Sequence, residues 1–430
     1  MKILLISSNR LKVILPPFPL GTAYLASNVD SRHKVEVVDL MFVEDYEAEL
    51  RRAITSFGPD VMGMSVRNVD NQDYADPVMY IEHDREVAEI SRQCSSAPIV
   101  LGGGAFSTYP VDYLQYLHAD LGIVGEGERV FSYLLDAMER GHGHADIPGL
   151  VYREDERVVV NPPDYIQDID LIEPPAWGLF DLERYQEGNA RVTYQEKRGC
   201  HYCCAFCYTP SLEGRTFRLQ SPGKVLDELE VLHREYTVRR LAFVDSVFNE
   251  PPDYMEEICR SMIARGLEFQ WLALFYPLHF SRESLRLMKR AGCDLLLVGC
   301  DSGSEKMLKV YQKKFGKEDV ERACRYCEEL GIRYYAPLLL GGPGENRETV
   351  EESVAFFDSL HPEYITVTVG IRLYPGIPLA KRAIEERLIE PDDDLFWPRF
   401  YVSPEIRGWI DDYILRLAAK DPKWRAHITK

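Results

Sequence analysis

Apolar segments that alternate with amphipathic ones run through most of this 430-residue chain, and this rhythm limits its fold more than any other feature. Strands buried on both faces of a parallel sheet are almost continuously apolar, and the segments between them have the period of helices. In the first 140 residues, strands are predicted at 2–6, 34–39, 61–66, 98–101 and 120–124. Helices are predicted near 22–28, 46–57, 78–93, 111–117 and 128–140. We therefore expect an α/β fold that begins with a Rossmann-like, doubly wound parallel sheet.

A second series of the same kind follows a proline-rich connection. Its strands are predicted at 191–196, 240–245, 269–275, 294–299, 333–340 and 364–371, with helices between them, for example at 224–236, 254–265, 283–291, 317–330 and 348–360. Six such β/α units make a partial TIM-type barrel, because a closed one has eight. The predicted organisation is a first domain over 1–148, a hairpin and linker over 149–189, a partial (β/α)6 barrel over 190–390, and a short helical C-terminal region over 391–430.

Charge and hydropathy narrow the classes of partner. The chain has 50 Lys and Arg against 69 Asp and Glu, a net charge of −19, which repels phosphate backbones, so we expect no nucleic acid partner. No apolar run reaches the ~18 residues of a membrane span, and the apolar start is too short for a signal peptide. We expect a cytoplasmic protein without a membrane span.

Four of the ten cysteines are crowded into eight residues directly after the first strand of the second series. Cys200, Cys204 and Cys207 have the spacing C-x3-C-x2-C, whereas Cys203 breaks it and is at most a substitute for Cys204. Three thiolates can bind three irons of a 4Fe-4S cubane and leave the fourth iron open, whereas structural zinc usually takes four protein ligands. The alternative is an ordinary zinc site, or buried cysteines that bind no metal. Cys324 and Cys327 are expected to be structural.

This cysteine loop, with Phe206 before its last cysteine and a six-unit β/α series behind it, resembles that of the radical S-adenosylmethionine (SAM) enzymes. The resemblance implies that SAM binds the open iron and is cleaved reductively to a 5′-deoxyadenosyl radical. It also implies an electron donor such as ferredoxin or flavodoxin.

Segments 243–249, 299–304, 339–345 and 373–378 resemble the later strand-end motifs of the same family. By this resemblance the SAM-binding residues are Phe206, Asp245, Asp301, Ser302 and Gly341. Asp301 stands where the family usually has Glu.

The first domain resembles the cobalamin-binding domain that precedes many radical SAM enzymes, through segments 15–17, 59–65, 100–104 and 125–128. Glycines at strand ends let the backbone approach a large ligand. The implied cobalamin contacts are Ser65, Arg67, Asn68, Gly102, Gly103, Gly104, Gly125, Glu126 and Gly127. Segment 7–20 has no histidine, so we expect a cobalt without a lower His ligand. A Rossmann-like layer that binds nothing is the alternative.

Together these resemblances imply a cobalamin-dependent radical SAM methyltransferase that methylates an unactivated, sp3 carbon. They assign no catalytic residue. A cobalamin-binding cyclase or rearrangement enzyme remains open, as does a non-catalytic cobalamin or cluster sensor. A methylthiotransferase is disfavoured, because the N-terminal half has only Cys94. By resemblance one substrate is a residue in a protein chain, such as a glutamine of methyl-coenzyme M reductase. The rival is a small natural-product or lipid precursor.

Overall fold

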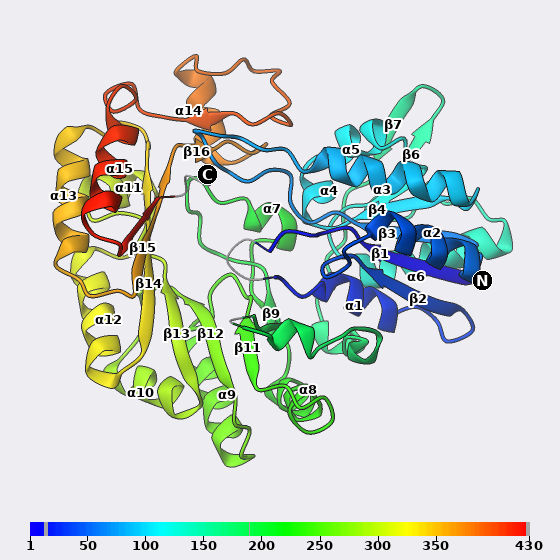
Figure 1. Cartoon of the computed structure of the whole chain (residues 1–430), viewed down its shortest axis with the longest axis horizontal. Helices are drawn as coiled ribbons and strands as arrows, with labels where there is room; N and C mark the ends of the chain where they lie inside the picture. Colours follow the sequence, from blue (N-terminus) through cyan, green and yellow to red (C-terminus); the bar gives the residue numbers. More distant parts are fainter. Residues whose placement is uncertain (13–15, 189, 427–430) are drawn as a thin grey trace. The chain divides into compact units, whose positions relative to one another are not determined.

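The computed structural model describes residues 1–12, 16–188 and 190–426 (Figure 1). Leu15, in one of the segments that resemble cobalamin-binding domains, lies outside the described residues. The chain divides into two compact units: unit 1 contains residues 1–71 and 79–193, and unit 2 contains residues 72–78 and 194–430. Each unit is described below by itself.

Unit 1 is built on one sheet with the strand order β2-β1-β3-β4-β5-β6-β7. The strands are β1 (Lys2–Ser7), β2 (Lys34–Asp39), β3 (Val61–Ser65), β4 (Ile99–Gly102), β5 (Leu121–Ile123), β6 (Leu150–Glu154) and β7 (Arg157–Val160). The first five are parallel, as predicted, and their order is 2-1-3-4-5. In such sheets the order reverses between β1 and β3, and ligands bind in the crevice at the carboxyl ends of the strands there.

The hairpin predicted as part of the linker is instead the edge of this sheet. β6 pairs antiparallel with β5, with Gly122 opposite Val151, and β7 pairs antiparallel with β6. Leu150 and Val151 are fully buried. Their apolar side chains need a partner layer, which explains why the structure places residues 149–193 in unit 1 and the unit boundary at 193.

The helices of unit 1 follow the predicted ones closely. They are α1 (Leu20–Ser27), α2 (Tyr46–Phe57), α3 (Ile81–Cys94), α4 (Gly104–Thr108), α5 (Pro110–Tyr116) and α6 (Gly127–Arg140). Helix α2 begins where the Asp45 carboxylate accepts the Ala48 N–H, and it ends at Gly58 with a φ of 61°. Helix α4 was not predicted, because five residues are too short to show helical periodicity. Three 3-10 turns, 169–171, 177–179 and 184–186, complete the unit.

Unit 2 is built on a second seven-stranded sheet, with the order β18-β15-β14-β13-β12-β11-β8. The strands are β8 (Val192–Tyr194), β11 (Arg240–Phe243), β12 (Gln270–Phe275), β13 (Cys293–Val298), β14 (Arg333–Leu340), β15 (Tyr364–Val369) and β18 (Trp424–Ala426). The first six are the predicted ones, in sequential order. β18 comes from the C-terminal region and pairs parallel with β15, with Trp424 opposite Ile365.

Two small two-stranded sheets lie among the loops of unit 2, formed by β9 (Lys197–Arg198) with β10 (Arg218–Leu219) and by β16 (Ile371–Arg372) with β17 (Phe400–Tyr401). The helices are α7 (Thr209–Glu213), α8 (Pro222–Arg234), α9 (Pro252–Ala264), α10 (Arg282–Arg290), α11 (Glu305–Val310), α12 (Lys317–Leu330), α13 (Arg347–Asp358), α14 (Pro378–Glu385) and α15 (Ile410–Lys420). Within the described parts of the chain, no helix is both long and apolar enough to cross a membrane.

Helices α9, α10, α12 and α13 line the outside of the curved sheet (Figure 1). The two faces of each strand therefore differ. On β14 the buried residues Tyr334, Ala336 and Leu338 alternate with the half-buried Tyr335 and Pro337. The helix-covered face is the core of the barrel unit, and the inner face is partly accessible.

Candidate functional site

The cysteine loop follows β9 and is held by backbone hydrogen bonds to distant parts of unit 2. The Cys200 N–H donates to the Gly214 carbonyl (3.2 Å), and the Ala205 N–H donates to the Tyr311 carbonyl (3.0 Å). The Ala205 carbonyl accepts the Leu379 N–H (2.9 Å). Residues after α11 and at the start of α14 thus fix the loop at the carboxyl ends of the strands.

The three thiols of the C-x3-C-x2-C spacing are free and only partly accessible: Cys200 is buried, and Cys204 and Cys207 are half-buried. Burial raises the pKa of Cys200 to about 11 and also raises the pKa of Cys204. The neighbouring thiols add to both shifts. Buried thiols crowded in this way become thiolates when a metal centre compensates their charge.

These thiols fit a cluster better than a single ion. Four sulfur ligands of one zinc each lie ~2.3 Å from the metal, so their sulfurs nearly touch. Among the described residues, the one set of His, Cys, Asp and Glu ligand atoms within 4.8 Å of one another is His33, Asp136 and Glu139. Arg32 already forms ion pairs with Asp136 and Glu139. The three cysteine sulfurs do not form such a compact set, which fits a cubane, in which each thiolate binds its own iron, better than one shared ion.

Cys203 differs from the other three cysteines of the loop because its side chain is exposed. Its Sγ lies 3.9 Å from Arg215 Nη1 and 3.7 Å from the His201 carbonyl oxygen. Cys324 and Cys327 are both buried on α12.

Asp301 follows β13 and has a left-handed backbone with a φ of 59°. Asp adopts this conformation more readily than Glu does, which gives a local reason for the shorter acid at this position. The Asp301 carboxylate forms an ion pair with Lys313, a residue that the sequence did not single out. The next predicted residue, Ser302, is fully buried, and its Oγ lies 3.2 Å from Ser353 Oγ and accepts the Ser304 N–H (3.1 Å).

Asp245 is placed behind the cysteine loop. Its side chain is buried, and Oδ1 accepts the N–H groups of Glu196 and Lys197, both at 3.0 Å. Burial, and then the Glu196 charge, raise the pKa of Asp245 well above its usual range. The Lys197 ammonium contacts Glu196 (2.9 Å) and donates to the carbonyls of Phe248 and Glu250. In this structure Asp245 braces the chain that leads into the loop.

A second buried acid, Glu345, closes the glycine turn after β14. Its Oε2 accepts the N–H groups of Gly341 and Gly342. Gly341 has a φ of 118°, and a Cβ there would lie 3.2 Å from the Gly370 nitrogen and the Tyr401 oxygen. Burial raises the pKa of Glu345 to about 7, although the two N–H groups oppose the shift. The sequence showed this acid only as part of a motif, because its partners are backbone groups.

One hydrogen bond and one ring stack, both made by Tyr202, link the cysteine loop to neighbouring strand ends. The Tyr202 hydroxyl donates to Glu250 (3.0 Å), and Glu250 is also 2.6 Å from His279 Nδ1. The Tyr202 ring stacks on Tyr276 at 4.0 Å. Residues far apart in the sequence meet here, and no local pattern indicated that they would.

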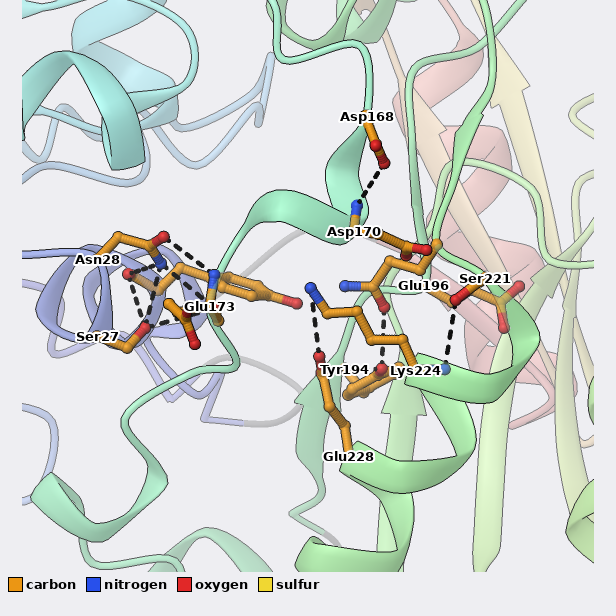
Figure 2. Close-up of polar contacts among 12 residues, drawn as sticks. Ser27, Asn28, Asp168, Asp170, Glu173, Tyr194, Glu196, Ser221, Lys224 and Glu228 are labelled. Atoms are coloured by element: carbon orange, nitrogen blue, oxygen red, sulfur yellow. Dashed lines mark hydrogen bonds and ion pairs between the residues drawn. The ribbon is translucent and has the colours of Figure 1, made fainter.

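The first strand of the unit 2 sheet is anchored in a similar way, as Figure 2 shows. The Tyr194 hydroxyl lies 3.0 Å from Gln220 Oε1 and 3.0 Å from Glu228 Oε2, and the Lys224 ammonium lies 3.9 Å from Glu228. Ser221 caps α8 by accepting the Lys224 N–H (3.4 Å). These contacts fix the start of α8 against β8.

In unit 1 the predicted cobalamin residues lie at the carboxyl ends of β3, β4 and β5, next to the reversal of strand order. Gly103 has a φ of 99°, and a Cβ there would lie 2.4 Å from the Val66 oxygen. Gly125 has a φ of 77°, and its N–H donates to Ser107 Oγ (3.0 Å). Gly104 and Gly127 are the first residues of α4 and α6. Both turns therefore present backbone N–H groups at this edge of the sheet.

The polar residues of this edge differ in what they contact. Arg67 is exposed, and its Nη1 lies 3.3 Å from Asn68 Oδ1. Glu126 is buried and its Oε2 accepts the Ile166 N–H (2.8 Å), so its carboxylate holds the segment after the hairpin. The Ser65 carbonyl accepts a hydrogen bond from Ser8 Oγ (3.0 Å).

Behind Ser8 lie a buried acid and a histidine from α3. Asp84 Oδ1 is 2.7 Å from Ser8 Oγ, and burial raises the pKa of Asp84 to about 7. His83 Nε2 is 2.9 Å from the Ser8 carbonyl oxygen, and its ring packs edge-on against Tyr46. His83 Nε2 is thus already hydrogen-bonded to the backbone after β1.

Comparison with known proteins agrees with both units. Residues 197–357 match the Radical SAM superfamily model, and residues 9–135 match the B12 binding domain model. The chain is 28% identical to the uncharacterized methyltransferase PH0819 of Pyrococcus horikoshii, over 86% of this chain and 79% of that protein. It is 28% identical to an anaerobic magnesium-protoporphyrin IX monomethyl ester cyclase of Rubrivivax gelatinosus, over 80% of this chain and 62% of that protein.

A solved structure also matches both units. The radical S-adenosylmethionine methyltransferase TsrM of Kitasatospora setae, with cobalamin and a [4Fe-4S] cluster bound, is similar with a TM-score of 0.81 and 26% identity, over 90% of this chain and 75% of that one. The predicted arrangement of a Rossmann-like unit followed by a partial barrel is thereby confirmed.

Proposed function

This chain belongs to the cobalamin-dependent radical SAM enzymes, and we propose that it is a methyltransferase that acts on an unactivated carbon atom of its substrate. The observation that carries the proposal is that one chain combines a three-thiol loop at the strand ends of a β/α unit with a 2-1-3-4-5 sheet whose glycine turns lie at the carboxyl ends of β4 and β5. The first arrangement fits a cluster with one open iron, and the second fits a large flat cofactor.

When bound, the cluster and SAM supply a 5′-deoxyadenosyl radical, and cobalamin carries the methyl group. Cys200, Cys204 and Cys207 would hold the cluster, and Ser65, the turns at 102–104 and 125–127, and the Arg67-Asn68 pair would hold cobalamin. Because segment 7–20 has no histidine and His83 Nε2 is hydrogen-bonded to the Ser8 carbonyl, we propose a cobalt without a lower His ligand. An electron donor such as ferredoxin or flavodoxin would reduce the cluster.

The apolar side chains on the inner face of the barrel favour a substrate whose reacting group is uncharged. The half-buried side chains of its strands include Leu272, Leu274, Leu297, Pro337 and Leu339. Such apolar side chains exclude water from a radical. This favours chemistry on a C–H bond over proton transfer.

The first test is product stoichiometry. Anaerobic turnover with reconstituted cluster and cobalamin should consume two SAM molecules per methylated product and give equal amounts of S-adenosylhomocysteine and 5′-deoxyadenosine. Methyl-deuterated SAM should transfer its label to the product. Formation of 5′-deoxyadenosine without S-adenosylhomocysteine, with a modified substrate, would instead identify a cyclase or rearrangement enzyme, the activity named for the Rubrivivax relative. Absence of both products with loaded cofactors would identify a sensor.

The second test concerns the substrate. We propose a residue in a protein chain, such as a glutamine of methyl-coenzyme M reductase, and small natural-product or lipid precursors form the other arm. Mass spectrometry after incubation with each class should show a gain of one methyl group in the peptide arm. A gain confined to the small-molecule arm would overturn the protein substrate and leave the methyl transfer intact.

A further inference from the structure

Lys313 is a buried cation for which the cysteine motif and the glycine turns give no reason. It lies in the segment between α11 and α12, and its side chain is only 5% exposed. Burying an ammonium group is expensive unless an anion and further contacts compensate it. The residues around Lys313 should therefore include the groups that compensate its charge.

The ammonium group contacts an anion and an aromatic ring from different elements. It forms an ion pair with Asp301 Oδ2, after the end of β13, and its nitrogen lies over the ring of Phe206 in the cysteine loop. The Asp301 carboxylate compensates the positive charge of the buried ammonium group. Lys313 thus remains charged at this position.

Aromatic rings complete the enclosure. The Lys313 nitrogen lies 5.3 Å from the Phe206 ring centroid, 5.6 Å from that of Tyr276 and 5.7 Å from that of Phe315. Rings at these distances attract a cation and exclude water. A charge held in a water-poor site acts strongly on its neighbours, because little solvent screens it.

We propose that Lys313 is a positioning residue that holds Asp301 against the cysteine loop and raises the reduction potential of the cluster bound there. A cluster gains one negative charge on reduction, so a fixed, buried cation beside the cysteine loop favours the reduced form. This inference rests on the proposed cluster but not on the methyl transfer.

The test is the midpoint potential of the reconstituted cluster, followed by electron paramagnetic resonance without substrate. Lys313→Met should lower the ratio of reduced to oxidised cluster about tenfold at fixed potential, which corresponds to about 59 mV for one electron. Lys313→Arg should keep the wild-type potential. Lys314→Met is the matched control, because Lys314 is the next residue and is exposed. Equal potentials in Lys313→Met and Lys314→Met would overturn the inference.

Asp301→Asn tests the same pair from its other side. Without the carboxylate, the Lys313 charge loses its counter-ion, so the potential should rise rather than fall. This variant keeps the inference testable if Lys313→Met does not fold, and an unchanged or lower potential in Asp301→Asn would contradict it. A shift of potential in an enzyme that transfers no methyl group would support the role of Lys313 while refuting the proposed function.

Discussion

At the strand ends of unit 1 the chain presents mainly glycine and small hydroxyl residues, whereas at the strand ends of unit 2 it presents buried charged side chains with partners. The turns at Gly103 and Gly125 depend on positive φ angles and on close backbone approach. In unit 2 the ion pair of Lys313 with Asp301 and the contact of Lys197 with Glu196 surround the cysteine loop. A large neutral surface needs an accommodating backbone, while a charged cluster needs fixed ligands and counter-charges.

The buried acids show the same difference. In unit 1 the Asp84 carboxyl is held by the Ser8 hydroxyl, and burial is the main influence on its pKa. In unit 2 the Asp301 carboxylate is held by a full positive charge. Substitutions at these strand ends of unit 1 should therefore mostly change the backbone conformation and the stability of the fold. Those in unit 2 should mostly change the binding and properties of the metal centre.

The largest expected effect belongs to the thiols of unit 2. Replacing Cys200, Cys204 and Cys207 together with Ala should abolish cluster binding, measured as iron and sulfide content and as visible absorption, because no ligand set remains. Cobalamin binding by unit 1 should persist in this variant.

Cys203→Ala is the control, since Cys203 is exposed and contacts Arg215. It should keep about four iron and four sulfide per chain. A triple variant that retains its cluster, or a Cys203→Ala protein that loses it, would show that the ligands have been misassigned.

The next effect concerns the buried acid of unit 1. The folded-state pKa of Asp84 is raised to about 7, so the folded protein holds this proton more tightly than the unfolded chain does. Stability should therefore fall as the pH rises from about 4 to 7, by up to about 4 kcal/mol from this group. Asp84→Asn should remove that part of the pH dependence, measured by denaturant unfolding at pH 5 and pH 8. Parallel curves for the two proteins would mean that Asp84 ionises normally.

The smallest effect distinguishes backbone strain from ligand contact at the glycine turn of unit 1. Gly103→Ala places a Cβ 2.4 Å from the Val66 oxygen at a positive φ, so it should lose about 1–3 kcal/mol of stability even without cobalamin. At Gly102 the nearest atom to a Cβ is the Ile123 oxygen at 3.9 Å, so Gly102→Ala should fold normally. A selective loss of cobalamin affinity in Gly102→Ala would place the cofactor against this turn.

Most of the regular structure could be predicted from periodicity. Helices α2 and α12 and strand β14 have the predicted bounds, because each is long and strongly patterned. Short elements such as α4 and β18 were missed. The hairpin was assigned to the linker, because its alternating pattern does not say which sheet it joins.

The candidate site divides along the same line. The three cysteines were identified from local spacing, and the glycine turns from their place after apolar strands. Lys313, Glu345, Tyr202 and Glu250 were not, because their partners are distant in the sequence or belong to the backbone. Asp245 was predicted to bind SAM, and that role stays a prediction; only the tertiary structure showed that its Oδ1 also accepts the Glu196 and Lys197 N–H groups.

By itself, the sequence determined which segments are strands and helices, where the thiols are concentrated and where the chain needs glycine, since each depends on neighbours within a few turns. Only the tertiary structure decided the strand order of unit 1, the addition of β6, β7 and β18 to sheet edges, and the pairing of Lys313 with Asp301. Those outcomes depend on burying apolar surface and on compensating buried charge. Both are settled by residues that meet only after the chain has folded.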